Sequence, residues 1–225
     1  MGPTVTLTFD NGPTHEVTPR VLDVLRERGV RSTFFVVGEQ LRAPGATAIA
    51  RRAATEGHWI GNHTLTHSIP LAELGDRDAV DREIAETQEM IGDLSHPDRL
   101  FRPFGRGGII DERLLGAHAL RRLEEGRFTC ILWNSVPRDW EDPNGWVKTC
   151  LDDVASRAWS VVVVHDLPTG AMNHLPELLD GLDAIGARVV QEFPDECVPL
   201  RRGLRTPTFA CLPFETVPPE AHPGR

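Results

Sequence analysis

A carboxylate and a carboxamide stand side by side near the start of the chain, in the segment Asp10-Asn11-Gly12-Pro13. They directly follow the alternating run 5–9, which we predict to be a buried strand that opens into a loop at Asp10. A carboxylate in such a place can move a proton, and the adjacent amide oxygen can help to hold a metal ion. The pair therefore makes a hydrolytic metal site the first hypothesis to test.

Two histidines at metal-ligand spacing, His63 and His67, follow a later predicted strand. Residues four apart lie on one side of a helical turn, so we expect both imidazoles to face one ion. An isolated pair with this spacing is more often structural than metal-binding. Here the pair follows a strand end, on the same predicted face as Asp10, and that position favours a metal site.

Polar side chains also follow the next three predicted strands. Arg102 ends the fourth strand and could pair with a carboxylate and fix its rotamer. Asp139 follows the fifth strand and could orient a histidine or an arginine, while its neighbour Trp140 could form the wall of a sugar-sized cleft. His165 follows a continuous apolar strand, where it can serve as a general acid. For Arg102 and His165 the alternative is a surface or purely structural role.

Apolar strand-like runs alternate with helical patterns along most of the chain. The predicted strands are 4–9, 33–37, 58–61, 99–102, 129–133, 160–164 and 188–190. The predicted helices are 17–28, 44–56, 76–91, 111–125, 144–158 and 173–185. This alternation implies a parallel sheet with helical crossovers, either open or closed as a barrel. Polar residues after the first, third, fourth, fifth and sixth strands favour a barrel, in which those strand ends converge on one face.

The order and the local sequences of these segments resemble the polysaccharide deacetylase (NodB-homology) family of carbohydrate esterases, over about residues 4–191. The family reads TFDDGP, H(S/T)xxH, RPPY, DxxDW and LxH in that order. The corresponding segments here are 8–13 (TFDNGP), 63–67 (HTLTH), 102–104 (RPF), 136–140 (VPRDW) and 163–165 (VVH). The five in order form a specific match, although no single one would suffice. The resemblance implies an α/β fold, a distorted (β/α)7 barrel of the NodB-homology type in a single domain.

The resemblance also implies metal-dependent hydrolysis of an N-acyl or O-acyl group. Asp10 would be the general base, oriented by Arg102. His165 would be the acid that protonates the leaving amine, tethered by Asp139. The metal would be held by Asn11, His63 and His67. Zinc is the usual ion for two imidazoles and one oxygen, although cobalt, nickel or another divalent ion would fit. The implied substrate contacts are Phe104, through its backbone N–H, and the residues Trp140 and Val163.

Four positions depart from the family pattern. Asn11 replaces the metal-binding aspartate, and because a carboxamide brings no charge, we expect weaker metal affinity. Phe104 stands where the family usually has tyrosine, in a segment one residue shorter than usual. Val136 replaces an aspartate, and Val163 replaces a leucine, which alters an apolar pocket.

Composition narrows the class of partner. The net charge is −9 and the pI is near 5.5, with no Lys/Arg-rich run, so we expect neither nucleic acid nor an anionic membrane as a partner.

No secretory signal is visible, and the four cysteines are widely spaced, as expected of reduced thiols in a cytoplasmic protein. The Pro-rich segment 192–225 lacks periodicity and is predicted to be a C-terminal tail that packs on a catalytic domain, residues 1–191, and frays at its end.

The leading hypothesis is a metal-dependent hydrolase that removes an acyl (acetyl) group from an N-acylated sugar or a related small amide. Two alternatives remain open at this point. One is a cyclic imide or amide hydrolase of the same family. The other is a non-catalytic protein that binds a ligand in its pocket and has lost strong metal binding at Asn11. Each predicts a small-molecule ligand, and none predicts an oligomeric state.

Overall fold

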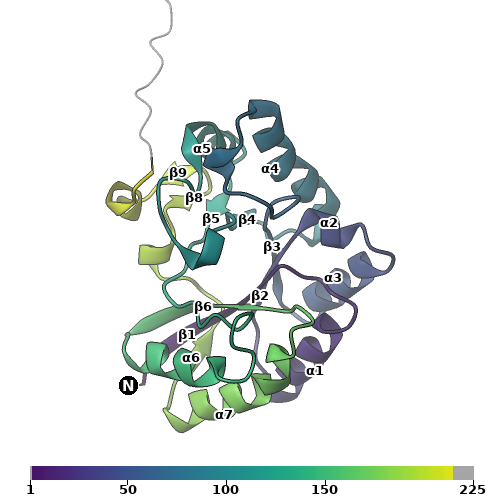
Figure 1. Cartoon of the computed structure of the whole chain (residues 1–225), viewed down its shortest axis with the longest axis vertical. Helices are drawn as coiled ribbons and strands as arrows, with labels where there is room; N and C mark the ends of the chain where they lie inside the picture. Colours follow the sequence, from purple (N-terminus) through teal and green to yellow (C-terminus); the bar gives the residue numbers. More distant parts are fainter. Residues whose placement is uncertain (1, 215–225) are drawn as a thin grey trace, which may run out of the picture.

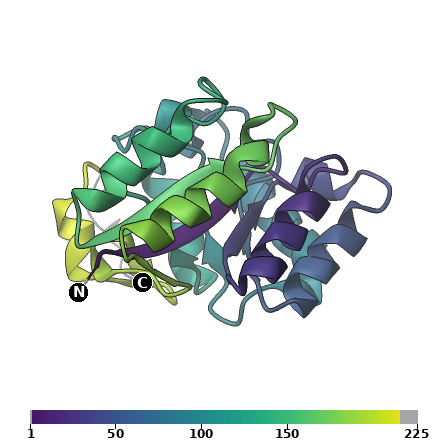
Figure 2. The same ribbon diagram turned by 90° about the horizontal axis from the view of Figure 1, so that it is seen from below.

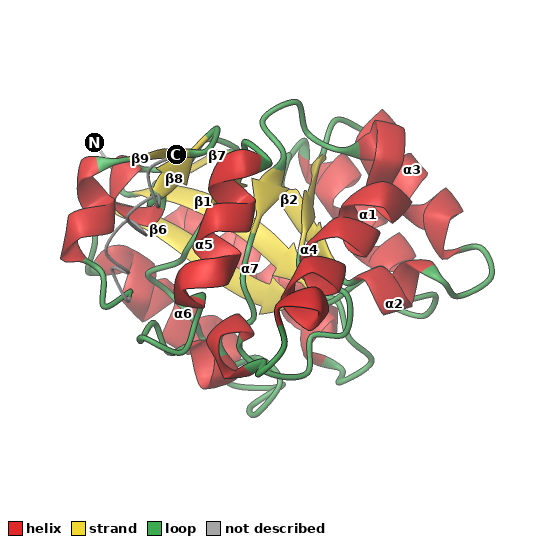
Figure 3. Ribbon diagram, turned by 90° about the horizontal axis from the view of Figure 1, so that it is seen from above, coloured by secondary structure: helices red, strands yellow, loops and turns green. Residues whose placement is uncertain are grey.

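The structure is a computed structural model, and it describes residues 2–214. Helices lie outside and strands inside, as Figure 3 shows. Six parallel strands run in the order β6, β1, β2, β3, β4, β5. Their bounds are β1 Thr4–Asp10, β2 Thr33–Val36, β3 Trp59–Asn62, β4 Leu100–Phe101, β5 Thr129–Cys130 and β6 Trp159–His165. None of the described helices is both long and apolar enough to cross a membrane.

The strands close into a ring, as the barrel prediction requires. The segment after β5 bridges to β6 through Ser135 and Val162, and the Val163 N–H donates to the Ser135 carbonyl at 3.0 Å. A seventh parallel strand, β7 (Arg188–Val190), pairs with the first half of β1, whereas β2 pairs with the second half. The predicted fold, a distorted β/α barrel, is confirmed, and β7 beside the start of β1 is part of the distortion.

Alternation along β1 decides which residues face the barrel interior. Val5, Leu7 and Phe9 are fully buried in the core that the surrounding helices share. The alternate positions Thr8 and Asp10 therefore face inward, because successive side chains of a strand point to opposite faces. The sequence pattern of this strand thus delivers a hydroxyl and a carboxylate to the barrel interior.

The α-helices of the described chain cover the barrel. Their bounds are α1 Thr18–Arg28, α2 Gly38–Leu41, α3 Ala46–Thr55, α4 Arg77–Ile91, α5 Gly116–Glu125, α6 Trp146–Ala155 and α7 Leu175–Ala184. In α1, Val21, Leu22 and Leu25 form the buried stripe, and Gly29 ends the helix in a left-handed conformation. Helices α6 and α7 pack side by side near β6 and β1, as Figures 1 and 2 show.

Several element boundaries differ from the predictions, and the local backbone explains two of the differences. Strand β5 covers two residues rather than 129–133, because Ile131 and Leu132 donate to Phe101 and to Cys197, outside a regular ladder. Helix α5 begins at Gly116 rather than at 111, since Gly116 has a φ of 69°, through which a right-handed helix cannot continue. The four-residue helix α2 is too short to produce a period in the sequence.

The segment after β7 adds an antiparallel hairpin that the sequence pattern does not reveal. Its strands are β8 (Leu200–Arg201) and β9 (Leu204–Arg205), and β8 pairs with β5, so the sheet is mixed rather than purely parallel. Phe209 and Phe214 are buried, with ring centroids 5.7 Å apart. The division of the chain at residue 191 stays a prediction, and the predicted fraying end at 215–225 lies outside the described residues.

Candidate active site

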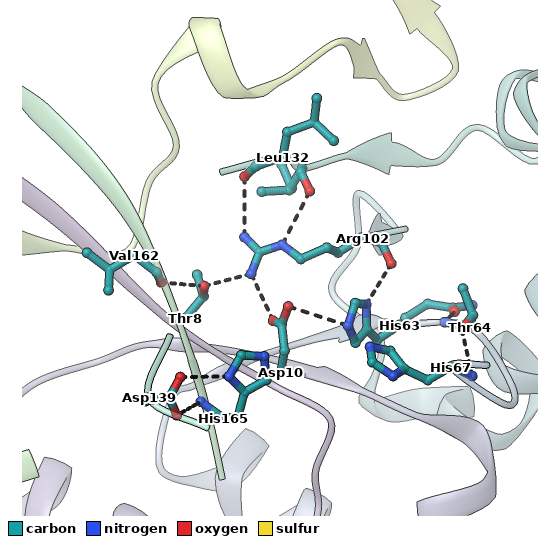
Figure 4. Close-up of polar contacts among 12 residues, drawn as sticks. Thr8, Asp10, His63, Thr64, His67, Arg102, Leu132, Asp139, Val162 and His165 are labelled. Atoms are coloured by element: carbon teal, nitrogen blue, oxygen red, sulfur yellow. Dashed lines mark hydrogen bonds and ion pairs between the residues drawn. The ribbon is translucent and has the colours of Figure 1, made fainter. Parts of the chain in front are cut away.

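The carboxyl ends of the parallel strands bring the predicted polar residues to one end of the barrel, which Figure 4 shows in close-up. Asp10 and His165 are the last residues of the paired strands β1 and β6 and are partners in register. His63 and Arg102 directly follow β3 and β4, whose last residues are Asn62 and Phe101. The expected convergence of strand ends is therefore present in the structure.

Arg102 is fully buried, and three of its nitrogen atoms donate hydrogen bonds. Its Nη1 donates to the Asp10 Oδ1 at 2.8 Å and to the Thr8 Oγ1 at 2.6 Å. Its Nε and Nη2 donate to the carbonyls of Ile131 and Leu132 at 3.3 and 3.4 Å. The guanidinium therefore fixes one oxygen of Asp10 in place and leaves Oδ2 for other partners.

His165 is bonded twice to the fully buried carboxylate of Asp139. Its Nδ1 lies 2.8 Å from Oδ1, and its backbone N–H donates to Oδ2 at 2.9 Å. Burial alone would lower the pKa of His165, but the hydrogen bond to Asp139 and the charge of that carboxylate outweigh burial, and the pKa is raised. Because Nδ1 is directed to Asp139, Nε2 is the ring nitrogen left for a ligand. Trp140 packs edge-on against the ring, with centroids 4.8 Å apart.

His63 and His67 meet with ring centroids 4.6 Å apart. The Nδ1 of His63 lies 2.8 Å from the Arg102 carbonyl, which can only accept, so Nδ1 carries the proton and Nε2 has a free lone pair. Burial lowers the pKa of His63 to about 3. Burial, and then the charge of His63, lower the pKa of His67 to about 2. Both rings are therefore neutral at physiological pH, which is the form that binds metals.

Asn11 supplies a third donor at the same pocket. Its Oδ1 is buried and has no hydrogen-bond partner among the described residues. A buried amide oxygen without a partner is unfavourable unless something outside the chain satisfies it. The described residues contain no cluster of three His, Cys, Asp or Glu side chains suited to a metal ion. Two neutral imidazoles and one amide oxygen are a donor set that a divalent ion accepts.

The segment that carries the two histidines is not the helical turn that their spacing predicts. Thr64 and His67 have φ angles of 67° and 50°, and the Thr64 Oγ1 accepts from the His67 N–H at 3.2 Å. The carboxylate of Glu83, in α4, accepts from the N–H groups of Leu65 and Thr66 at 2.8 and 3.0 Å. The prediction of a helical turn is wrong, because a buried carboxylate from a distant helix shapes this loop.

These residues surround a cavity of about 260 Å³. The lining contains the predicted residues Asp10, Asn11, His63, His67, Phe104, Trp140, Val163 and His165. The other two predicted residues, Arg102 and Asp139, lie behind this lining and are fully buried. Trp133 and Leu167 also line the cavity, and the Trp133 Nε1 donates to the Gly108 carbonyl at 2.9 Å.

Asp166 lies fully buried behind the loop that carries Asn11. Its carboxylate accepts from the hydroxyl of Thr18, and its backbone carbonyl accepts from the Thr14 hydroxyl at 2.7 Å. Burial raises the pKa of Asp166 to about 6. A β-carbon at Gly12 would lie only 2.2 Å from its Oδ2, so the loop passes this carboxyl without room for a side chain. The sequence contains no signal for this contact beyond the position of Asp166 next to a pocket residue.

The chain is similar in sequence to known proteins. The sequence model described as polysaccharide deacetylase matches residues 1–119 of the chain. A peptidoglycan-N-acetylglucosamine deacetylase from Bacillus cereus is 34% identical over 184 residues, which cover 80% of this chain and 61% of that protein. A chitooligosaccharide deacetylase from Rhizobium leguminosarum bv. trifolii is 36% identical over 162 residues, which cover 71% of this chain and 70% of that protein.

A solved structure agrees with these sequence matches. A family 4 carbohydrate esterase from Streptomyces lividans, in complex with acetate, superposes with a TM-score of 0.71 and 25% identity, covering 87% of this chain and 96% of that chain. The chain thus matches nearly the whole of that structure. It spans less than two thirds of the Bacillus cereus protein.

Proposed function

Since the chain belongs to the polysaccharide deacetylase family, we propose that it is a metal-dependent hydrolase that removes the acetyl group from an N-acetylated sugar. The observation that carries the proposal is that two ionisable side chains at one pocket are each held by a different buried residue. Asp10 is held by Arg102, and His165 is held by Asp139. A base and an acid with independent partners can move protons in opposite directions during one hydrolysis.

Asn11, His63 and His67 are the residues that would hold the metal. The unpartnered Oδ1 of Asn11 and the neutral imidazoles support this assignment. A bound divalent ion would polarise the acyl carbonyl and make a water molecule more acidic at neutral pH. Zinc is the ion that this donor set favours, and cobalt or nickel would also fit it.

Asp10 takes the proton of the attacking water in this proposal. Its Oδ1 is engaged by Arg102, so the proton would go to Oδ2, which lies 3.4 Å from the Nε2 of His63. The water oxygen forms a bond to the acetyl carbon. Arg102 keeps the carboxylate in one rotamer, so the second oxygen is always available to the reacting water.

His165 donates a proton from Nε2 to the amine nitrogen as the carbon–nitrogen bond breaks. Its raised pKa favours the protonated ring from which the leaving group takes the proton. The products are acetic acid, which loses its proton in solution to become acetate, and an amine that can take up that proton, and transfer of the proton from Asp10 to His165 through solvent restores the starting state. The backbone N–H of Phe104 is the proposed donor to the oxyanion, and one such donor is worth about 3 kcal/mol.

The size and lining of the cavity support a small substrate unit at the reacting end. Ligand pockets typically have volumes of about 300–1,000 Å³, and this cavity, at about 260 Å³, is slightly smaller than that range. Val136, Val163 and Leu167 give it an apolar wall on which the acetyl methyl group can rest. The names of the relatives support an N-acetylglucosamine unit of peptidoglycan or a chitooligosaccharide as the substrate class.

Acetate release and metal content together test this proposal. The purified protein is stripped with a chelator, reloaded with zinc or cobalt, and incubated with N-acetylglucosamine oligomers and, in parallel, with a cyclic imide. We expect acetate release that requires the metal. Ring opening of the imide without acetate release would favour the imide hydrolase instead. Absence of both reactions, with no metal retained after reloading, would contradict a hydrolase and leave a protein that only binds a ligand.

A further inference from the structure

Non-glycine residues with left-handed backbone gather at two places in the described chain. Asn11, Thr64, His67 and Arg138 belong to or adjoin the candidate active site. The other three are all arginines, with φ angles of 48° at Arg99, 55° at Arg127 and 50° at Arg202. All three line a second cleft of about 510 Å³. Such backbone is uncommon outside glycine, and strained positions cluster at functional sites.

This second cleft lies away from the candidate active site. Arg99 directly precedes β4, Arg127 lies two residues before β5, and Arg202 lies in the turn between β8 and β9. The cleft is therefore at the amino ends of β4 and β5, whereas the candidate active site is at the carboxyl ends of the parallel strands. Figure 1 shows β4, β5 and β8 grouped together near α5. The lining is completed by Pro97, Asp98, Glu125 and Gly126.

Local turns explain the left-handed backbone but not the choice of arginine. Arg127 follows the end of α5, and its N–H donates to the Glu124 carbonyl at 3.0 Å. Arg202 and Gly203 form the two-residue link of the β8–β9 hairpin. Glycine and asparagine adopt this conformation with less strain than arginine does. Arginine thus occupies each of the three positions against the local backbone preference.

The positive charge at this cleft is only partly compensated. The Arg202 Nη2 lies 2.6 Å from the Asp98 Oδ1, and Glu125 is engaged by Arg122 at 3.3 Å. Within residues 2–214, neither Arg99 nor Arg127 lies within 4.0 Å of a carboxylate oxygen. Two guanidinium groups at the cleft therefore have no anionic partner in this part of the chain.

Arg99 is also held in place by an aromatic ring. Its guanidinium carbon lies 4.4 Å from the centroid of the Phe128 ring. Its Nε is buried and has no hydrogen-bond partner among the described residues. Packing thus positions this guanidinium, while its hydrogen-bonding capacity is not fully used within the same region.

Backbone hydrogen bonds hold the loops of the cleft together. The Thr129 N–H is shared by the carbonyls of Asp98 and Arg99, each at 3.1 Å, and the Thr129 Oγ1 accepts from the Arg202 N–H at 3.0 Å. The Gly203 N–H donates to the Phe128 carbonyl at 2.8 Å. The arginines are therefore anchored at fixed backbone positions, which lowers the conformational cost of binding a ligand.

We propose that this cleft is an anion site that binds a phosphate group through Arg99 and Arg127. Guanidinium groups match phosphate oxygens in a bidentate geometry, and one phosphate has enough acceptors for two arginines. Arg202, paired with Asp98, is the third cation at the rim. The chain as a whole carries −9, so the local arginines must provide the attraction, and the binding must weaken as salt rises.

Titration with defined phosphates tests the site without reference to deacetylation. Inorganic phosphate, a hexose phosphate and a short polyphosphate are each titrated into the full chain at low salt, by calorimetry. We expect saturable binding that Arg99→Gln and Arg127→Gln each weaken at least tenfold. Arg20→Gln is the matched control, because Arg20 is an exposed arginine that does not line the cleft. Tighter binding of polyphosphate than of hexose phosphate would indicate that the cleft binds a phosphate polymer. Tighter binding of hexose phosphate would indicate that it binds a small phosphate ester.

Two results of this titration would overturn the proposal. The first is no saturable binding of any of the three phosphates. The second is equal weakening by Arg20→Gln, which would show that phosphate responds only to the net charge of the protein.

The variant Arg127→Gly distinguishes an arginine that binds phosphate from one that only stabilises the turn. Glycine relieves the left-handed strain, so we expect a higher midpoint of thermal unfolding together with lost phosphate affinity. Retained affinity in Arg127→Gly, or a lower midpoint, would contradict the proposal.

Discussion

Asp139 holds His165 at two points, the ring Nδ1 at 2.8 Å and the backbone N–H at 2.9 Å. One carboxylate thus fixes both the position of the residue and the direction of its ring. It also supplies the negative charge that outweighs burial and raises the pKa of the imidazole. The acid proposed for the leaving amine therefore depends on a residue that does not line the pocket.

Asp139→Asn tests this dependence through the pH profile. An amide carries no charge, so the pKa of His165 should fall, and the protonated ring should be lost at a lower pH. Activity that needs His165 protonated declines as pH rises through this pKa, so the alkaline limb of kcat/KM should move to lower pH. We expect kcat to fall by about 10²-fold or more, the scale of general acid catalysis. An unshifted alkaline limb would show that His165 is not the titrating acid.

Asp10→Asn separates the proposed base from the metal ligands. The amide oxygen can still accept from the Arg102 Nη1, so the local geometry should survive. The amide cannot take a proton at neutral pH, and we expect turnover to fall by about 10²–10⁴-fold. Bound metal, measured by mass spectrometry after dialysis, should stay at the level of the unaltered protein. Loss of the metal in this variant would make Asp10 a ligand instead of the base.

Asn11→Asp tests the carboxamide as a metal ligand. A carboxylate adds a full negative charge at the place where Oδ1 has no partner in the described chain. We therefore expect metal affinity to rise at least tenfold, or about 1.4 kcal/mol, measured by competition with a fluorescent chelator. Asn173→Asp is the matched control, because it adds the same charge at an exposed position outside the pocket lining. Equal or weaker affinity in Asn11→Asp would show that Asn11 does not bind the metal.

The barrel and the positions of the strand ends could be predicted because their signals are local. Alternation in β1 places Asp10 at an inward position, and the apolar run of β6 ends at His165. Each parallel strand carries its own pattern, and the crossover rule then brings the strand ends to one face. These local signals locate the candidate pocket to within a residue or two of each strand end.

The supports behind the pocket could not be predicted, because they depend on contacts between distant segments. Glu83 stands among the charged residues of α4, a pattern typical of a solvent-exposed face, yet it is 8% exposed and shapes the loop of His67. The left-handed conformations of Thr64 and His67 have no periodic signal. The β8–β9 hairpin is likewise too short to show alternation, so its pairing with β5 is visible only in the structure.

Asp166→Asn should stabilise the protein at neutral and alkaline pH. The pKa of this buried carboxyl is raised from 3.8 to about 6, because burial disfavours the charged form. The native state thus holds a proton that the unfolded chain releases near the ordinary pKa. The contribution of this group to the free energy of unfolding is fully present below the ordinary pKa of 3.8. It falls by about 3 kcal/mol in total as pH rises through the raised pKa of about 6. An amide stays neutral at every pH, and its oxygen can still accept from Thr18.

The free energy of unfolding is measured by urea denaturation in the presence of a chelator. We expect Asp166→Asn to be more stable than the unaltered protein at about pH 8 and equally stable below about pH 4. Asp183→Asn is the control, since Asp183 is exposed and the same loss of charge there should leave the pH dependence unchanged. A variant that is less stable at the higher pH, or that keeps the original pH dependence, would show that the carboxylate form of Asp166 supports the loop of Asn11. Either result would also mean that the space left by the missing β-carbon of Gly12 accommodates a charged carboxylate.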